Sequence, residues 1–358
     1  MIESAYLLVP FLISLVLTPL VKQYSIPAQT YAKENHRTVH HGKISRIGGV
    51  AIYLSFMISM AIYMKADRAI TGIILGGSIM FFTGLVDDLI DIKPPVKLFF
   101  EVVAALVLIY YGVQVDRIRL PFGLTIDFGL ISFLFTIIWI AGITNAVNLI
   151  DGLDGLSGGM SVIILVVIGC IALIERRPDI VSLAFILAGS TFGFLIYNSH
   201  PASIFMGDCG SLFLGSMISA ISIVGFKSST ILTLALPILL LIIPIIDTLS
   251  AILRRTLKGM KFSQADKSHL HHLLMKQFGH RNTVIIMCGF TALFGLSAYV
   301  YMINRNLGFF TMLALLFFVE LFIEKSAMIS EKFHPLLGLW HRIKRVWTKK
   351  IKNKGEDK

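Results

Sequence analysis

The chain is organised by long apolar segments that alternate with short polar ones. A membrane-spanning helix needs about 20 predominantly apolar residues, and segments of that length recur along almost all of the 358 residues. The pattern therefore predicts an all-α, polytopic integral membrane protein with about eleven transmembrane helices. The expected spans are residues 4–22, 47–64, 69–86, 96–113, 129–147, 158–174, 181–198, 209–226, 230–250, 283–303 and 308–325.

The amino-acid composition favours the same class. Hydrophobic residues make up 56% of the chain and charged residues only 15%, whereas a soluble domain contains about 25% charged residues. The net charge of +11 would suit a nucleic-acid partner in a soluble protein. In a membrane protein an excess of Lys and Arg instead records topology and contact with anionic lipid. We therefore expect a membrane environment and no nucleic acid.

The Lys and Arg residues of the polar segments predict the orientation of the chain. With the N-terminus outside, 24 of the 32 basic residues fall on inner segments and 8 on outer ones. Cytoplasmic loops carry an excess of Lys and Arg, so we expect an outside N-terminus and a cytoplasmic C-terminus. The chain would be a multi-pass protein of the cell (inner) membrane, and residues 326–358 would form a basic cytoplasmic tail.

The residues that can do chemistry collect on the cytoplasmic side of this topology, where all ten histidines and most aspartates fall. Ionisable groups in a membrane protein are costly unless they pair, bind ions or take part in chemistry. A transporter, the competing class, would place them nearer to the middle of the bilayer. The distribution favours a site at the inner rim. The loops expected to form it are residues 23–46, 87–95, 148–158, 199–208 and 251–282.

The first candidate cluster ends the third expected span, in the sequence GLVDDLIDIKPPVK. Asp87, Asp88 and Asp91 place three carboxylates within about one helical turn, and like charges that close favour a bound cation or a shifted pKa. An Asp-x-x-Asp pair also occurs at helix starts, so the motif alone leaves both interpretations open. Lys97 would return to the same rim, where it either meets a phosphate or only extends its charge to the membrane surface.

Two further clusters combine aspartates with glycines. In NAVNLIDGLDGLSGG, Asp151 and Asp154 share a face if the segment is helical, and the glycines let the backbone approach a ligand closely. In NSHPASIFMGDCGSLFLG, Asp208 lies in a tight turn that opens a span. Such a turn can present one carboxylate together with free N–H groups. Phe205 either stacks on a base or is an ordinary membrane-interface aromatic residue.

The fourth cluster, ADKSHLHHLL, carries His269, His271 and His272. A zinc site would need three or four ligands, but no cysteine is near and the spacing is not that of a zinc protease. Phosphate binding fits better, because Arg254 and Arg255 lie close by. Together the four clusters offer hard oxygen ligands, basic groups and glycines, a set that suits Mg²⁺ bridging phosphates.

At these four motifs the sequence resembles the polyprenyl-phosphate N-acetylhexosamine-1-phosphate transferase superfamily, of the glycosyltransferase family 4 type. The motifs occur in the order of the family between about residues 20 and 285. The chain is most similar to bacterial undecaprenyl-phosphate GlcNAc-1-phosphate transferases, which start the synthesis of teichoic acid, O-antigen or enterobacterial common antigen. The phospho-MurNAc-pentapeptide translocase of peptidoglycan synthesis is a cousin. The spacing Asp-x-x-His-x-His-His favours the GlcNAc branch over that cousin.

The resemblance implies a transmembrane transferase domain over residues 1–325. It implies transfer of N-acetylhexosamine 1-phosphate, expected to be GlcNAc 1-phosphate, from a UDP-sugar to polyprenyl phosphate, with release of UMP. It also implies Mg²⁺ as the cofactor, with Mn²⁺ able to replace it, and leaves a homodimer open. The first cytoplasmic loop lacks Asp and Pro residues usual in the family, and Lys267 stands where Arg is commoner. These departures leave the exact sugar open.

The resemblance also implies roles for individual residues. Asp87 and Asp88 match the catalytic aspartate pair, and Asp151 and Asp154 match the acidic pair of the second motif. Asp208 matches the aspartate that holds Mg²⁺, and we expect Asp151 to contribute to the same ion. The residues expected to contact the substrates are Arg37, His40, Arg46, Lys97, Asn148, Asn198, Phe205, His269, His271 and His272.

Overall fold

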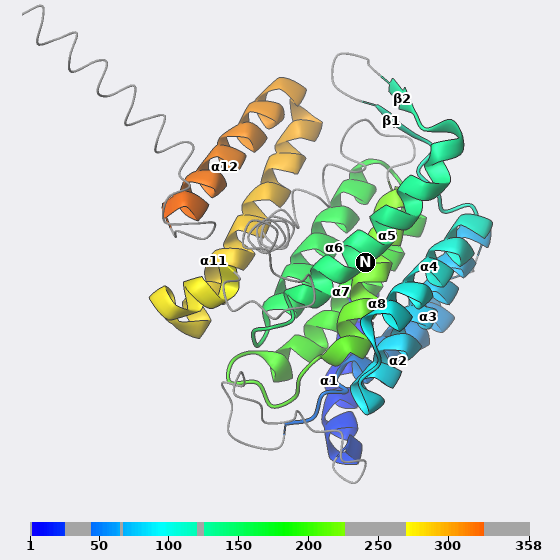
Figure 1. Ribbon diagram of the computed structural model, residues 1–358. Helices are drawn as coiled ribbons and strands as arrows, with labels where there is room; N and C mark the ends of the chain where they lie inside the picture. Colours follow the sequence, from blue (N-terminus) through cyan, green and yellow to red (C-terminus); the bar gives the residue numbers. More distant parts are fainter. Residues whose placement is uncertain (1, 26–43, 65–66, 120–124, 226–269, 326–358) are drawn as a thin grey trace, which may run out of the picture.

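The computed structural model describes residues 2–25, 44–64, 67–119, 125–225 and 270–325, which form a bundle of long helices (Figure 1). Ten α-helices lie within these ranges. They are α1 (Ile2–Ser25), α2 (Gly49–Tyr63), α3 (Arg68–Ile90), α4 (Pro94–Tyr110), α5 (Ser132–Leu149), α6 (Leu156–Ile174), α7 (Pro178–Asn198), α8 (Gly207–Gly225), α11 (Leu270–Ile303) and α12 (Arg305–Lys325).

The expected all-α, polytopic architecture is confirmed, because each of these helices overlaps one of the expected spans. Within the described ranges, seven helical segments are long and apolar enough to cross a membrane. The expected span at 230–250 and the basic tail lie outside the described residues. A total of eleven spans, and the orientation of the chain in the membrane, therefore stay predictions.

The centre of the bundle is formed by α7 and α8, which are the most deeply buried of the apolar helices described. Helix α8 packs against α3 and α5, and α7 packs against α1 and α6. Lipid gives helices no hydrophobic drive to associate, so close packing over small residues takes its place. Gly189 and Gly193 of α7 accordingly lie against the backbone of α1 at Leu7 and Phe11.

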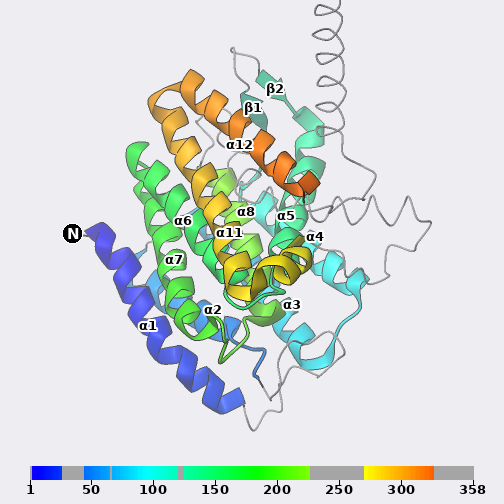
Figure 2. The ribbon, with the colours of Figure 1, turned by 90° about the vertical axis from the view of Figure 1, so that its left-hand side faces the viewer.

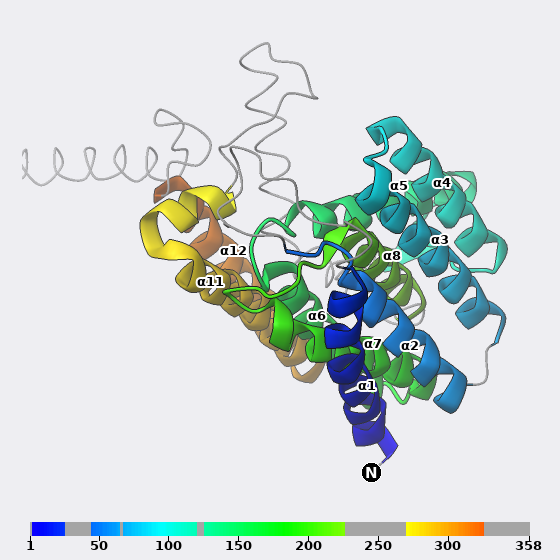
Figure 3. The ribbon, with the colours of Figure 1, turned by 90° about the horizontal axis from the view of Figure 1, so that it is seen from below.

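Two helix pairs flank this centre. Figures 1 and 3 place α3 and α4 on one side of the bundle and α11 and α12 on the opposite side. Figure 2, viewed from the side of the second pair, shows α11 lying over α6, in agreement with the contacts between these two helices. Helix α11 is interrupted at Gly279, whose φ is 76° and ψ 170°.

The short link between α3 and α4 has a direct consequence for function. Asp91 adopts a left-handed conformation with φ 53° and ends α3. Pro94 then begins α4, a position that proline tolerates because the first turn of a helix leaves its N–H groups unpaired. Two antiparallel neighbours result, so that Asp87 near the end of α3 and Lys97 near the start of α4 lie at the same end of the bundle.

A small β-ribbon was not expected from the sequence. Strand β1 (Arg117–Arg119) pairs with β2 (Thr125–Asp127) in an antiparallel register, between α4 and α5. Each strand has only three residues, too few for alternation of apolar and polar side chains to give a signal. Since α4 enters this connection from the end that carries Asp87, the ribbon lies at the opposite end, as Figure 1 shows.

Candidate active site

One end of the bundle brings together segments that are far apart in the sequence. The C-terminal ends of α3, α5 and α7 meet the N-terminal ends of α2, α4, α6 and α8 there, because successive helices run in opposite directions. This region, which carries Asp87, Asp88, Asp154 and Asp208, is called the carboxylate end below. It contains two clusters of charged and polar side chains.

The first cluster is built around Lys97 and is called the bridged cluster. The Nζ of Lys97 lies 2.6 Å from Oδ2 of Asp87 and 2.5 Å from Oδ2 of Asp208. The three side chains come from α4, α3 and α8. The other oxygen of Asp87, Oδ1, accepts the backbone N–H of Ile92 at 2.8 Å. Charges taken out of water need such partners, and here two carboxylates converge on one cationic point.

Asp88 completes the bridged cluster in a different way from its neighbour. Its Oδ1 accepts the N–H of Asp208 at 3.0 Å, and its Oδ2 accepts the N–H of Cys209 at 2.9 Å. The first N–H groups of a helix have no partner within the helix, so Asp88 of α3 caps α8 from outside. Gly207, with φ 72°, makes the turn that leads into this cap. Asp88 thereby fixes the backbone that carries Asp208.

Asn148, Asp151 and Arg46 surround the bridged cluster. Asn148 donates to Oγ of Ser211 at 2.8 Å, one turn into α8 from Asp208. Asp151 as a residue is partly exposed, but protein atoms surround its carboxyl group closely. Burial raises the pKa of Asp151 well above its usual range, and the charges of Asp208 and Asp88 act in the same direction, whereas Arg46 opposes them.

The donor chemistry of the bridged cluster fits a divalent cation. The cluster holds three carboxylates, Asp87, Asp88 and Asp208, and one ammonium group, that of Lys97, which leaves a formal excess of two negative charges. The oxygens of Asp87 and Asp208 already converge on a cation, the Nζ of Lys97. Mg²⁺ prefers carboxylate oxygens of this kind together with phosphate oxygens. The residues present therefore fit Mg²⁺, while Asp208 and Asp151 as its ligands stay a prediction.

The second cluster, called the histidine cluster, consists of Asp154, His200 and His280. Oδ2 of Asp154 accepts the N–H of Ala202 at 3.1 Å and lies 2.8 Å from Nδ1 of His200. The ring of His200 stacks on that of His280, with centroids 4.1 Å apart. His280 follows the break of α11 at Gly279. One ligand atom from each of the three residues falls within 4.8 Å of the others.

The predicted substrate residues Asn198 and Phe205 lie at the two ends of the connection between α7 and α8 and hold it in place. Asn198 is 3% exposed. Its Oδ1 accepts the N–H of Gly155 at 3.1 Å, and its Nδ2 donates to the carbonyl of Ile204 at 2.9 Å. The backbone of Phe205 pairs with that of Ser45 and Gly48. In this structure the amide of Asn198 therefore serves the protein's own backbone.

The other predicted substrate residues divide into two groups. Arg46 lies at the carboxylate end, where its guanidinium is 3.9 Å from Asp91. The structure does not describe the side chains of the other predicted substrate residues, so their roles stay predictions. These are Arg37, His40, His269, His271 and His272.

The structure places several further polar residues at the carboxylate end that the sequence analysis did not name as candidates. Glu101 of α4 is 2% exposed and accepts a hydrogen bond from Nδ2 of Asn145 at 2.7 Å. A lone glutamate in the apolar run FFEVVAAL was a usable signal. His200 and His280 are 80 positions apart, and no spacing rule connects them. Ser211, the partner of Asn148, had no signal.

The fold and this site define a class, that of multi-pass membrane proteins with a cluster of carboxylates and a lysine at one end of the bundle. Comparison with known proteins is more specific. The sequence model of the family described as glycosyl transferase family 4 matches residues 70–226. The chain is 38% identical to a probable undecaprenyl-phosphate N-acetylglucosaminyl 1-phosphate transferase of Bacillus subtilis, over 94% of this chain and 95% of the relative.

Two further relatives are less similar to the chain than the Bacillus subtilis protein. A putative UDP-N-acetylglucosamine–dolichyl-phosphate N-acetylglucosaminephosphotransferase of Saccharolobus solfataricus is 30% identical, over 82% of this chain and 95% of the relative. A phospho-N-acetylmuramoyl-pentapeptide-transferase of Streptococcus uberis is 32% identical, over 64% of this chain and 76% of the relative. The chain belongs to glycosyl transferase family 4, as the resemblance of its motifs indicated.

Proposed function

We propose that this protein transfers N-acetylglucosamine 1-phosphate from UDP-N-acetylglucosamine to undecaprenyl phosphate, or a related polyprenyl phosphate, and releases UMP. The reaction would be the first membrane step in the synthesis of a cell-envelope polysaccharide such as teichoic acid or O-antigen. The observation that carries the proposal is the convergence of Asp87, Lys97 and Asp208 from three helices. The names of the relatives in Bacillus subtilis and Saccharolobus solfataricus support the sugar and the acceptor class.

In this reaction an oxygen of the lipid phosphate attacks the phosphorus bonded to the sugar. The bond from that phosphorus to the bridging oxygen breaks, and UMP leaves with the electron pair. One diphosphate linkage replaces another, so no ATP is needed. A phosphate monoester has a second pKa of about 6, which makes the lipid phosphate mostly a dianion at neutral pH. Removal of a proton from the nucleophile is therefore a secondary task for the protein.

The main obstacle is electrostatic, because an anionic nucleophile must approach an anionic diphosphate. Two unit charges at 4 Å repel by roughly 4 kcal/mol at an effective dielectric constant of 20. Lys97 supplies fixed positive charge at this place, and Asp87 holds its ammonium group in position. Mg²⁺ bound at Asp208 and Asp151 would supply further positive charge to the phosphate oxygens. Asp88 keeps Asp208 oriented through the first turn of α8.

We place the reaction at the cytoplasmic face of the cell membrane. The support is the distribution of Lys and Arg along the sequence, three quarters of which fall in segments expected on the same side as the carboxylate end. Cytoplasmic loops carry this excess. The apolar helices described by the structure would keep the lipid acceptor within the bilayer while its phosphate reaches the rim.

The test is exchange of radiolabelled UMP into UDP-N-acetylglucosamine by the purified full-length protein in detergent. We expect label exchange that requires both polyprenyl phosphate and Mg²⁺, because the reaction must run forward and back. A panel with UDP-N-acetylgalactosamine and UDP-MurNAc-pentapeptide defines the sugar. If label exchanged only with UDP-MurNAc-pentapeptide, the protein would instead catalyse the phospho-MurNAc-pentapeptide transfer of peptidoglycan synthesis. No exchange with any donor, under conditions where the protein is folded, would contradict the proposal and favour a transporter.

A further inference from the structure

The buried face of α4 begins with a charged residue. Ala104, Ala105 and Leu108 are fully buried on this face, and Glu101, which opens the same stripe, is 2% exposed. Positions three and four apart on a helix share a face, so the four residues form one continuous stripe. An ionisable side chain within a membrane-spanning segment is costly and usually marks a function. The position of Glu101 therefore calls for a functional explanation.

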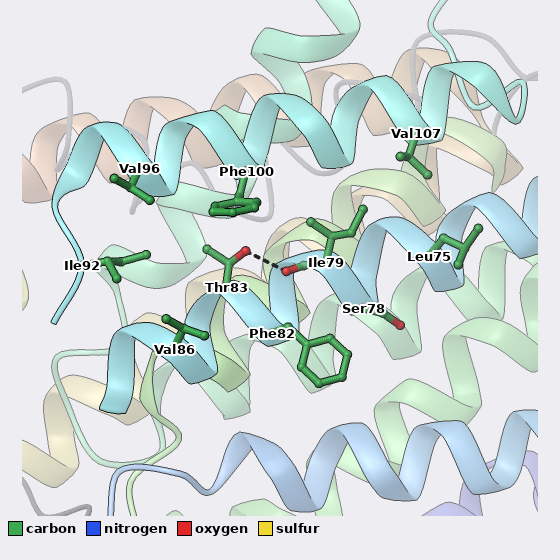
Figure 4. Close-up of a pocket in the computed structure, with 10 residues that line it drawn as sticks. All are labelled: Leu75, Ser78, Ile79, Phe82, Thr83, Val86, Ile92, Val96, Phe100 and Val107. Carbon is green, nitrogen blue, oxygen red and sulfur yellow. Dashed lines mark hydrogen bonds between the residues drawn. The ribbon is translucent and has the colours of Figure 1, made fainter. Parts of the chain in front are cut away.

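The partner of Glu101 lies on α5 rather than on α3. Val96, Phe100 and Val107 of α4 face α3, where they line an apolar groove (Figure 4). Glu101 lies on a different face of α4, and its Oε2 accepts a hydrogen bond from Nδ2 of Asn145 at 2.7 Å. The amide of Asn145 is neutral. A buried carboxylate also needs a compensating positive charge.

Lys97 is the basic residue placed to balance this carboxylate. It precedes Glu101 by four positions, so the two lie on the same face of α4, one turn apart. Side chains of a helix lean toward its N-terminus, which directs the carboxylate of Glu101 toward the turn that carries Lys97. The charges of the two side chains attract each other. Since the ammonium group itself contacts Asp87 and Asp208, Glu101 acts on it from one turn deeper in the bundle.

The hydrogen bond to Asn145 also ties this part of α4 to its neighbours. Asn145 lies three positions before Asn148 on α5, and Asn148 donates to Oγ of Ser211 in α8 at 2.8 Å. Polar contacts thus join α4 to α5, and α5 to α8, next to the bridged cluster. Glu101 thereby helps to fix the helix that carries Lys97 relative to α8.

We propose that Glu101 is a positioning residue for Lys97, whose ammonium group its buried charge holds at the bridged cluster. The inference rests on the proposed function, in which Lys97 meets the substrate phosphates. A cation or a phosphate that arrives at the rim competes for the contacts of Lys97 with Asp87 and Asp208. The carboxylate of Glu101 is buried and keeps its place, so the ammonium group retains one fixed partner throughout the reaction.

The experiment compares Glu101→Gln with Glu101→Asp in the full-length protein. Glutamine keeps the size of the side chain and can still accept from Asn145, but it loses the charge, whereas aspartate keeps the charge. We expect Glu101→Gln to lower turnover in UMP exchange about tenfold. This is less than the 10²-fold cost of a misplacement of about 1 Å, because Asp87 still holds the ammonium group. Glu101→Asp should retain more turnover. If Glu101→Gln is as active as the unmodified protein or more active than Glu101→Asp, the inference is wrong.

A double variant tests whether Glu101 acts through Lys97, with the melting temperature in detergent as a measurement independent of activity. Loss of one partner of a buried charge pair destabilises a protein, whereas loss of both leaves no uncompensated charge. We therefore expect Glu101→Gln to lower the melting temperature of the unmodified protein and to raise that of Lys97→Met, each by about 2–4 °C. The matched control is Glu175→Gln, at the opposite end of α6 from the carboxylate end, which should shift both by the same amount.

A shift of the same sign and size in both backgrounds would mean that Glu101 acts only through Asn145, and would overturn the inference. If Lys97→Met does not fold, the comparison of glutamine with aspartate at position 101 decides. Failure of UMP exchange in the unmodified protein would instead contradict the proposed function, and would leave the comparison of melting temperatures unaffected.

Discussion

The two clusters at the carboxylate end are built from the same residue type in different surroundings. In the bridged cluster, Asp87 and Asp208 sit on helix ends and share the cation of Lys97. In the histidine cluster, Asp154 sits in a connection between helices, and a backbone N–H together with His200 occupies one of its oxygens. The first arrangement holds three carboxylates and one ammonium group, and so a formal excess of two negative charges, whereas in the second a single carboxylate meets a backbone N–H and an imidazole ring.

This difference separates two tasks that an enzyme of this kind must perform. Excess negative charge on rigid helix ends can hold a cation against phosphate oxygens. Asp154, which lies between α5 and α6, instead contacts His200 and the N–H of Ala202 in the connection between α7 and α8, and so fixes the start of the segment that leads from His200 to Asp208. We therefore expect the bridged cluster to control turnover and the histidine cluster to control the position of the bound donor.

The largest effect should come from Asp208→Asn, which removes one negative charge and keeps the size of the side chain. Loss of a group that stabilises developing charge lowers turnover by about 10²- to 10³-fold, and we expect the upper end here because Lys97 also loses a partner. UMP exchange measures turnover, and electron paramagnetic resonance of Mn²⁺ measures metal binding. Asp116→Asn, at the opposite end of the bundle, is the control. Full loss of exchange with unchanged Mn²⁺ binding would contradict the metal role of Asp208.

A smaller effect, about 10²-fold in turnover, is expected for Asp88→Ala, because misplacement of a reacting group by about 1 Å costs that much. The alanine removes both acceptors from the N–H groups of Asp208 and Cys209. Loss of a helix cap costs about 1 kcal/mol of stability, so the melting temperature should also fall. Asp88→Asn keeps one carbonyl acceptor and should recover part of both losses.

The comparison of Asn with Ala at this position distinguishes positioning from direct chemistry. A general base would be lost equally in both variants, and neither the melting temperature nor the Mg²⁺ requirement would need to change. Equal inactivity of the two variants with an unaltered melting temperature would therefore show that Asp88 acts on the substrate. A graded loss that follows the melting temperature would support its role as the cap of α8.

Much of the fold followed from apolar length, because about 20 apolar residues in a row have few structures available to them in a membrane. Successive spans cross the membrane in opposite directions, so the positions of the aspartate motifs in the sequence were enough to predict that they lie at the same end of the bundle. The ribbon of β1 and β2 was not predicted, because strands of three residues are too short for an alternation of apolar and polar side chains to be recognised. Residues outside the described ranges, such as the expected span at 230–250, stay untested in this respect.

The roles of individual carboxylates could not be read from the sequence in the same way. Asp87 and Asp88 are neighbours and were expected to act as a pair. Successive residues of an α-helix point about 100° apart, so the first carboxylate meets Lys97 while the second meets the start of α8. Which neighbour meets which partner depends on how α3 packs against α4 and α8. The stacking of His200 on His280 depends in the same way on the break of α11.

The smallest effect should come from Asp154→Asn, and it is the sharpest test of the separation between the clusters. The amide keeps the size of the carboxylate but weakens the contacts to His200 and Ala202, and a hydrogen bond to a charged group contributes about 1.5–3 kcal/mol. We expect the KM for the UDP-sugar to rise about tenfold or more on this basis, with turnover at saturation and Mn²⁺ binding nearly unchanged.

The double variant Asp88→Ala, Asp154→Asn then tests independence, since effects at sites without shared partners add within about 0.3–0.5 kcal/mol. Additive losses would mean that each cluster performs its own task. If the double variant lost no more activity than Asp88→Ala alone, both clusters would act through one element, the segment from His200 to Asp208. In that case the histidine cluster would be a support of the bridged cluster, and the two tasks assigned above would reduce to one.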